Sequence, residues 1–129
     1  MKVLLAEDDI VTRSAVEAML TKNDHDVTCC ANGQEAIETL EMDEFDVVIT
    51  DLIMPQKDGI AVMDFIKQKE LNIPVIAISA GSKDDPGDYL AFASYFADET
   101  IAKPIKKENL LTALDSLANG GTPQSLFWN

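Results

Sequence analysis

The chain has 129 residues, 47% of them hydrophobic, which is enough for one compact domain with a packed core and argues against disorder. The 23 acidic and 10 basic residues give a formal net charge of −13, so we expect neither direct nucleic-acid binding nor attachment to anionic membranes. No apolar stretch reaches membrane-spanning length, and the adjacent Cys29 and Cys30 are poorly placed for a mutual disulfide, so we expect a reduced, cytoplasmic protein.

Short apolar runs alternate with amphipathic segments in the first half of the chain. In order they are a strand at residues 3–6, a helix with Val16, Met19 and Leu20 on its apolar face, a strand at 27–30, a helix with Ala36, Ile37 and Leu40, and a strand at 47–50. The spacing of the helical residues predicts that each helix buries one face.

The same alternation continues in the second half. It gives a helix with Val62, Met63 and Ile66, a strand at 75–78, an aromatic helix at about 88–96 with Tyr89, Phe92, Tyr95 and Phe96, a weak strand at 100–102 and a helix with Leu110, Leu111, Leu114 and Leu117. Three of the five runs are nearly continuous in aliphatic or β-branched residues. This composition is typical of parallel strands that are buried on both faces.

Five strand–helix alternations predict an α/β fold in which five helices cover a doubly wound, five-stranded parallel sheet. In such folds ligands bind outside the carboxyl ends of the strands, near the point where the strand order reverses. Gly-Gly-Thr-Pro after Asn119 ends the last helix. We therefore expect one domain at residues 1–118 and a tail at 119–129 that is too short for an output domain.

Polar side chains follow four of the predicted strands. The first strand leads into Glu7, Asp8 and Asp9, the third into Asp51, the fourth into Ser79 and the fifth into Lys103 and Pro104. Because the carboxyl ends of parallel strands meet at one edge of the sheet, this edge would collect several carboxylates, one hydroxyl and one ammonium group.

Gathering carboxylates is costly, since two unit charges about 4 Å apart repel by roughly 4 kcal/mol at an effective dielectric constant of about 20. A bound cation or protonation must compensate. Oxygen ligands suit magnesium. Zinc is disfavoured because no His or Cys pair lies near these acids in the sequence. The alternative is that these acids cap helices, a role that fits Asp9. For Glu7, Asp8 and Asp51 together, a metal site is the preferred interpretation.

Four motifs lie at these strand ends in order. They are Lys2-Val-Leu-Leu-Ala-Glu-Asp-Asp, Asp46-Val-Val-Ile-Thr-Asp-Leu-Ile-Met-Pro-Gln-Lys-Asp-Gly, Pro74-Val-Ile-Ala-Ile-Ser-Ala and Ala102-Lys-Pro. Together they resemble the receiver domain of two-component response regulators over about residues 1–118. The resemblance implies a flavodoxin-like receiver fold with strand order 2-1-3-4-5. It also implies a phosphorylation-controlled signalling module that is not an enzyme beyond its own phosphotransfer and dephosphorylation.

The resemblance also implies residue roles. Asp51 matches the phosphoacceptor and is a Mg²⁺ ligand. Glu7 and Asp8 match the acidic pair, with Asp8 binding Mg²⁺ directly and Glu7 acting through water. The backbone carbonyl of Ile53 would supply a further ligand. Lys103 matches the lysine that pairs with Asp51 at rest and with a phosphoryl oxygen afterwards.

Further implied roles concern the switch and the partners. Ser79 matches the switch hydroxyl, and the bond between Lys103 and Pro104 is expected to be cis. Thr100 stands where the family usually has an aromatic switch residue, and the glycine-rich loop at 80–87 looks longer than usual and is expected to be mobile until phosphorylation orders it. A histidine kinase or histidine phosphotransfer protein would donate the phosphoryl group, and a downstream protein would dock on the face formed by residues 88–117.

Two alternative functions can be compared with the phosphoacceptor. An aspartate-nucleophile phosphohydrolase generally needs a second aspartate two residues after the nucleophile, where this chain has Ile53. An unphosphorylated receiver-like adaptor would usually have lost an acid or the lysine, and this chain keeps them all. The sequence therefore favours the phosphoacceptor.

Overall fold

The computed structural model describes residues 1–52, 54, 56–79 and 96–118. The elements are β1 Lys2–Ala6, α1 Ile10–Thr21, β2 Asp26–Cys30, α2 Gly33–Met42, β3 Val47–Asp51, α3 Gly59–Gln68, β4 Val75–Ser79, β5 Glu99–Ala102 and α5 Lys107–Ala118. Most of the predicted aromatic helix, the loop at 80–87 and the tail at 119–129 lie outside the described residues. Within the described ranges, no helix is long and apolar enough to cross a bilayer.

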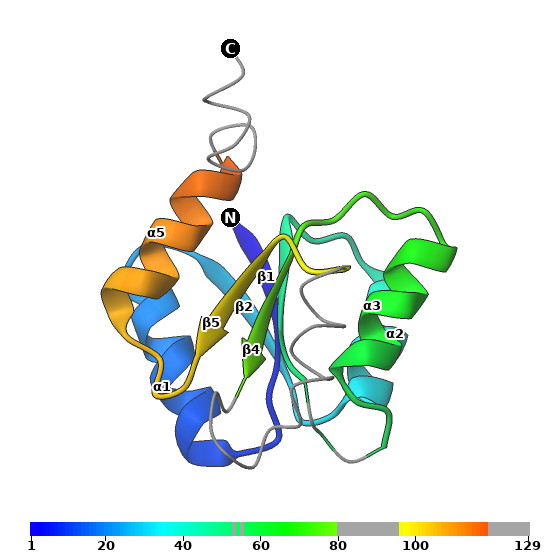
Figure 1. Cartoon of the computed structure of the whole chain (residues 1–129), viewed down its shortest axis with the longest axis horizontal. Helices are drawn as coiled ribbons and strands as arrows, with labels where there is room; N and C mark the ends of the chain where they lie inside the picture. Colours follow the sequence, from blue (N-terminus) through cyan, green and yellow to red (C-terminus); the bar gives the residue numbers. More distant parts are fainter. Residues whose placement is uncertain (53, 55, 80–95, 119–129) are drawn as a thin grey trace.

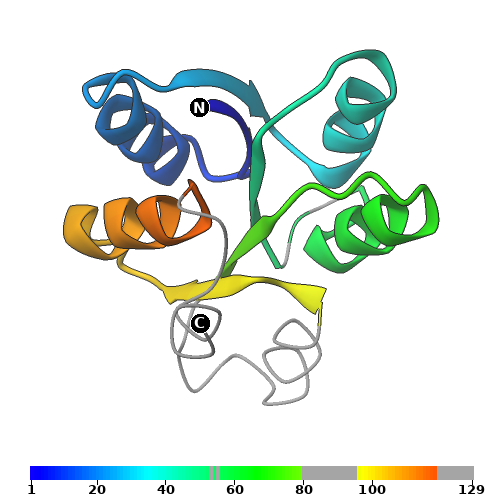
Figure 2. The same ribbon diagram turned by 90° about the horizontal axis from the view of Figure 1, so that it is seen from above.

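The five strands form one parallel sheet in the order β2-β1-β3-β4-β5, which confirms the predicted topology. Helices α1 and α5 cover one face of this sheet, and α2 and α3 cover the other (Figures 1 and 2). Strand β2 lies beside β1 on one side, and β3 lies beside β1 on the other side. The strand order therefore reverses between β1 and β3, where ligands bind in folds of this class.

Two apolar cores fill the space between the sheet and its helices. Leu4 and Val48 belong to the core under α2 and α3, while Leu5 and Ile49 belong to the core under α1 and α5. Neighbouring strand residues point to opposite faces, so a strand that is buried on both sides needs apolar residues at every position. This requirement explains the continuous apolar runs in β1, β3 and β4.

The register of the sheet brings the polar strand ends to one edge. Ala6 of β1 pairs with Thr50 of β3, so the residues that follow them, Glu7 and Asp51, come level with each other. On the other side of β3, Ser79 of β4 pairs with Ala102 of β5. Parallel strands of matched length thus carry residues from four distant parts of the sequence to one place.

Helices begin at this same edge, and side chains cap their first turns. Asp9 accepts a hydrogen bond from the Thr12 N–H at the start of α1, as expected, and Asn32 and Asp58 cap α2 and α3 in the same way. Such a cap stabilises a helix by about 1 kcal/mol. The caps fix where the loops around the candidate site end.

Candidate functional site

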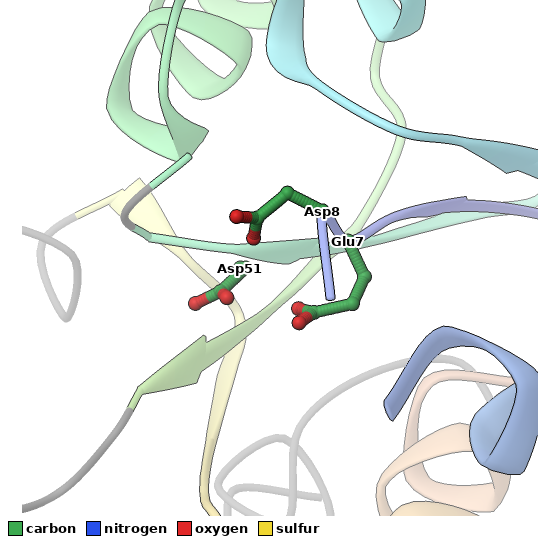
Figure 3. Close-up of side chains that lie close together, drawn as sticks. All are labelled: Glu7, Asp8 and Asp51. Atoms are coloured by element: carbon green, nitrogen blue, oxygen red, sulfur yellow. The ribbon is translucent and has the colours of Figure 1, made fainter. Parts of the chain in front are cut away.

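Three carboxylates meet at the carboxyl edge of the sheet. Glu7 and Asp8 follow β1, Asp51 ends β3, and each offers an oxygen atom within 4.8 Å of the others. Figure 3 shows the three side chains converging on one small volume. Glu7 is fully buried, Asp51 is 7% exposed and Asp8 is open to solvent. The expectation that these acids cluster is confirmed.

Lys103 lies in the loop between β5 and α5 and supplies the opposite charge. Its Nζ is 3.0 Å from Oε1 of Glu7 and 2.9 Å from Oδ2 of Asp51. Its backbone N–H donates to the carbonyl of Ser79 at 2.8 Å, which ties the loop to the end of β4. The peptide bond from Lys103 to Pro104 is cis, the form that the resemblance implied.

Burial and neighbouring charge change the acidity of Glu7. Its pKa is raised from 4.5 to about 7, mainly by burial and further by the nearby Asp51 carboxyl, while Lys103 lowers it. For Lys103, burial alone would lower the pKa, but the hydrogen bonds to Asp51 and Glu7 outweigh it, so the pKa is raised. The ammonium group therefore stays charged, and Glu7 exchanges a proton near neutral pH.

Both carboxylate oxygens of Asp51 accept hydrogen bonds. The Leu52 N–H donates to Oδ1 at 2.8 Å, and Lys103 donates to Oδ2. The backbone of Asp51 is packed against the start of α3, because a Cβ at Gly59 would overlap its carbonyl group. The Thr50 hydroxyl donates to that same carbonyl at 2.9 Å. The Asp51 side chain is therefore held in one orientation.

The donor set at this edge fits a hard divalent cation. All side-chain donors in the cluster are carboxylate oxygens, which Mg²⁺ prefers. Among the described residues, Oε2 of Glu7 is a buried oxygen without a hydrogen-bond partner, an arrangement that a metal-bound water would satisfy. The further ligand expected from the resemblance, the carbonyl of Ile53, lies outside the described residues.

The remaining predicted residues lie on β4, on β5 and in the loop that follows β5. Ser79 is 3% exposed at the end of β4, between β3 and β5 in the sheet. Thr100 is exposed on β5, and Pro104 is exposed beside Lys103. Tyr89, Phe92 and Tyr95 of the predicted aromatic helix lie outside the described residues.

One residue of the site was missed in the sequence. Arg13 in α1 donates from Nη1 to the carbonyl oxygen of Glu7 at 2.8 Å. It is the only arginine in the chain and follows the acidic run by one helical turn. That spacing was a usable signal, because a side chain on the first turn of a helix can reach back to the preceding strand.

Comparisons with known proteins place these features in context. A model of the family described as "Response regulator receiver domain" matches residues 3–115. Response regulator MprA of Mycolicibacterium vanbaalenii is 27% identical over 123 residues, which cover 95% of this chain and 52% of that protein. Other relatives are named as transcriptional regulators, and the chain spans about half the length or less of the first curated relatives it matches.

Two solved structures are similar in fold and sequence. The receiver domain of histidine kinase PA1611 from Pseudomonas aeruginosa, described with a magnesium ion in its active-site cleft, is 28% identical with a TM-score of 0.83 and covers 92% of this chain and 98% of that one. Response regulator TrrA from Thermotoga maritima, in complex with Mg²⁺ and BeF, is 25% identical with a TM-score of 0.80 and covers 91% and 99%.

Proposed function

Because this chain belongs to the response regulator receiver domain family, we propose that it accepts a phosphoryl group on Asp51 and changes its docking to partner proteins when phosphorylated. The observation that carries this proposal is the Asp51 carboxylate, fixed between the Leu52 amide and the Lys103 ammonium beside two further acids. A buried, oriented carboxylate beside a cation is suited to nucleophilic attack on phosphorus.

In the proposed step, a carboxylate oxygen of Asp51 attacks the phosphorus of a phosphohistidine on a kinase or phosphotransfer protein. The P–N bond breaks, and the imidazole leaves with the electron pair and takes up a proton. Lys103, which contacts Asp51 at 2.9 Å, would turn to an oxygen of the new aspartyl phosphate. Its role is charge neutralisation, which is the main contribution a protein makes to this type of transfer.

We assign the metal-holding role to Asp8 and Asp51 directly and to Glu7 through water. Bound there, Mg²⁺ would neutralise charge on the phosphoryl oxygens. The unpartnered Oε2 of Glu7 and the exposed carboxylate of Asp8 support this assignment. The carbonyl of Ile53 is kept as a proposed ligand on the strength of the family resemblance alone.

The switch is proposed to begin at Ser79, whose hydroxyl would donate to a phosphoryl oxygen and draw its loop inward. We propose the face at 88–117 as the surface for a downstream protein; β5 and α5 are the described parts of it. Thr100 is exposed on that face. It lacks the aromatic ring whose rotation in the family usually accompanies the movement of the switch hydroxyl. The net charge of −13 supports a protein partner over nucleic acid for this domain.

Intact-mass measurement after incubation with acetyl phosphate and Mg²⁺ tests the proposal. The wild type should gain one phosphoryl group, and Asp51→Asn or removal of Mg²⁺ should prevent the gain. Asp64→Asn, which changes an exposed acid on α3, is the matched control and should still gain one group. Steady release of phosphate from a phosphoester would instead favour a phosphohydrolase, and no mass gain by the wild type would refute the phosphoacceptor function.

A further inference from the structure

Arg13 links α1 to the carboxyl end of β1. Its side chain is half-buried, and Nη1 donates to the carbonyl oxygen of Glu7 at 2.8 Å. A hydrogen bond from a charged donor is stronger than one between neutral groups. The guanidinium group therefore has a specific backbone partner at the point where the chain leaves the sheet and enters the acidic cluster.

The two peptide groups that flank Glu7 are held from different sides. The Glu7 N–H donates to the carbonyl of Cys30 in β2 at 3.0 Å, which extends the strand pairing by one residue. The Glu7 carbonyl belongs to the next peptide group, the one that joins Glu7 to Asp8, and this group is held by Arg13. Arg13 thus controls the orientation of the peptide from which both acidic side chains diverge.

Asp8 depends on that backbone more than its neighbours do. Glu7 is fully buried and is bound through Oε1 by Lys103, and Asp51 is bound by Lys103 and by the Leu52 amide. Asp8 is exposed, and no hydrogen bond to its carboxylate is found within the described residues. Its place in the cluster is therefore set by the peptide that Arg13 holds.

We propose that Arg13 is a positioning residue that holds the peptide between Glu7 and Asp8, so that both carboxylates present their oxygens to a divalent cation. This inference rests on the proposed function, because it supposes that these acids serve Mg²⁺. Arg13 binds the backbone and needs no contact with the cation or the phosphoryl group for this role. It acts through the backbone, as groups behind the direct ligands do in other metal sites.

Electrostatics and positioning predict opposite effects when Arg13 is removed. Loss of a positive charge near the acids would strengthen the binding of a dication by a few-fold. Loss of a contact that orients the ligands would weaken binding, typically by about 10-fold or more. The sign of the change in Mg²⁺ affinity therefore separates a positioning role from a purely Coulombic one.

Arg13→Met is the decisive variant, because it keeps an unbranched apolar stem and removes the donor and the charge. Isothermal titration calorimetry with MgCl₂ at fixed pH and ionic strength should give a Kd about 10-fold weaker than that of the wild type. Lys22→Met removes the same charge at the other end of α1 and should change the Kd by less than about twofold. Metal-free Lys22→Met should have the far-UV circular dichroism spectrum and the denaturant midpoint of the wild type. These two proteins are the reference against which the folding of Arg13→Met is judged.

Arg13→Lys keeps the charge on a shorter donor and should bind Mg²⁺ with an affinity between those of the wild type and Arg13→Met. If Arg13→Met does not fold, a weaker Kd for Arg13→Lys supports the inference and a wild-type Kd overturns it. Equal or tighter binding by folded Arg13→Met also overturns it. A wild type that binds no Mg²⁺ would instead overturn the proposed metal site, and the inference with it.

Discussion

Replacement of Lys103 by methionine removes the cation that lies between two acids of the site. Its Nζ lies 3.0 Å from Glu7 and 2.9 Å from Asp51, whose side chains are 0% and 9% exposed. Breaking a buried ion pair by removing one partner typically costs about 3–5 kcal/mol. Here the cost is reduced because Lys103 is itself 26% exposed and because Glu7 can take up a proton.

We therefore expect Lys103→Met to lower the free energy of unfolding of the metal-free protein by about 2–3 kcal/mol at pH 8. The loss should be smaller at pH 5, since Glu7, with a pKa of about 7, is then protonated and needs no counter-charge. Urea unfolding at both pH values, with and without Mg²⁺, measures these differences. Mg²⁺ should stabilise the variant more than the wild type, because the ammonium group no longer competes with it.

Lys106→Met is the matched control, because it changes an exposed lysine in the same loop. Its free energy of unfolding should stay within about 0.5 kcal/mol of the wild-type value. A Lys103→Met protein as stable as the wild type at pH 8, or one whose stability loss is the same at pH 5, would refute the assignment of Lys103 as the counter-ion of this cluster.

Three further predictions concern neighbouring groups. The raised pKa of Glu7 means that its stabilising contribution is present below pH 4.5 and is lost as pH rises through about 7, so denaturation of metal-free Glu7→Gln across pH 5–8 should show a flatter stability profile than the wild type. Gly59→Ala would press a methyl group on the Asp51 carbonyl and should destabilise the protein by about 1–3 kcal/mol in urea unfolding; a wild-type midpoint would contradict this. Burial, and then the Glu17 carboxylate, raise the pKa of Cys29 to about 11. Alkylation of Cys29 by iodoacetamide at pH 8 should therefore be roughly 100-fold slower than that of a thiol of pKa 9, and it should become fast in urea. Tandem mass spectrometry measures the alkylation.

The fold could be predicted from the sequence because its strands are buried on both faces. The runs at 47–50 and 75–78 extend in the structure only by Asp51 and Ser79, the residues to which we assign the phosphoacceptor and switch roles. The weak run at 100–102 was harder to identify, because edge strand β5 has one face to solvent and begins at Glu99. Edge strands need fewer apolar residues, so their sequence signal is weaker.

The acids and the lysine of the site were predictable from the sequence, but Arg13 and the contacts within the site were not predicted. The acids and Lys103 could be identified because they follow predicted strands, and the carboxyl ends of parallel strands lie at one edge of the sheet. Which acids the ammonium group reaches depends on the path of the loop after β5, and the contact of Arg13 with the Glu7 carbonyl depends on how α1 crosses the sheet. The loop path has no local sequence pattern, and the only sequence signal for the Arg13 contact is its spacing of one helical turn from the acidic run. The switch role of Thr100 and the cytoplasmic location stay predictions.

The charges at the site explain why a receiver of this kind would keep so many acids together. Three ionised carboxylates and one ammonium group leave two uncompensated negative charges. One divalent cation would balance them. Without the cation, the raised pKa of Glu7 lets a proton supply part of the difference near neutral pH. An anionic phosphoryl donor would meet strong repulsion in either metal-free state, because Asp51, as the proposed nucleophile, would attack in its ionised form. The same acids that repel the donor would therefore make the reaction conditional on the metal.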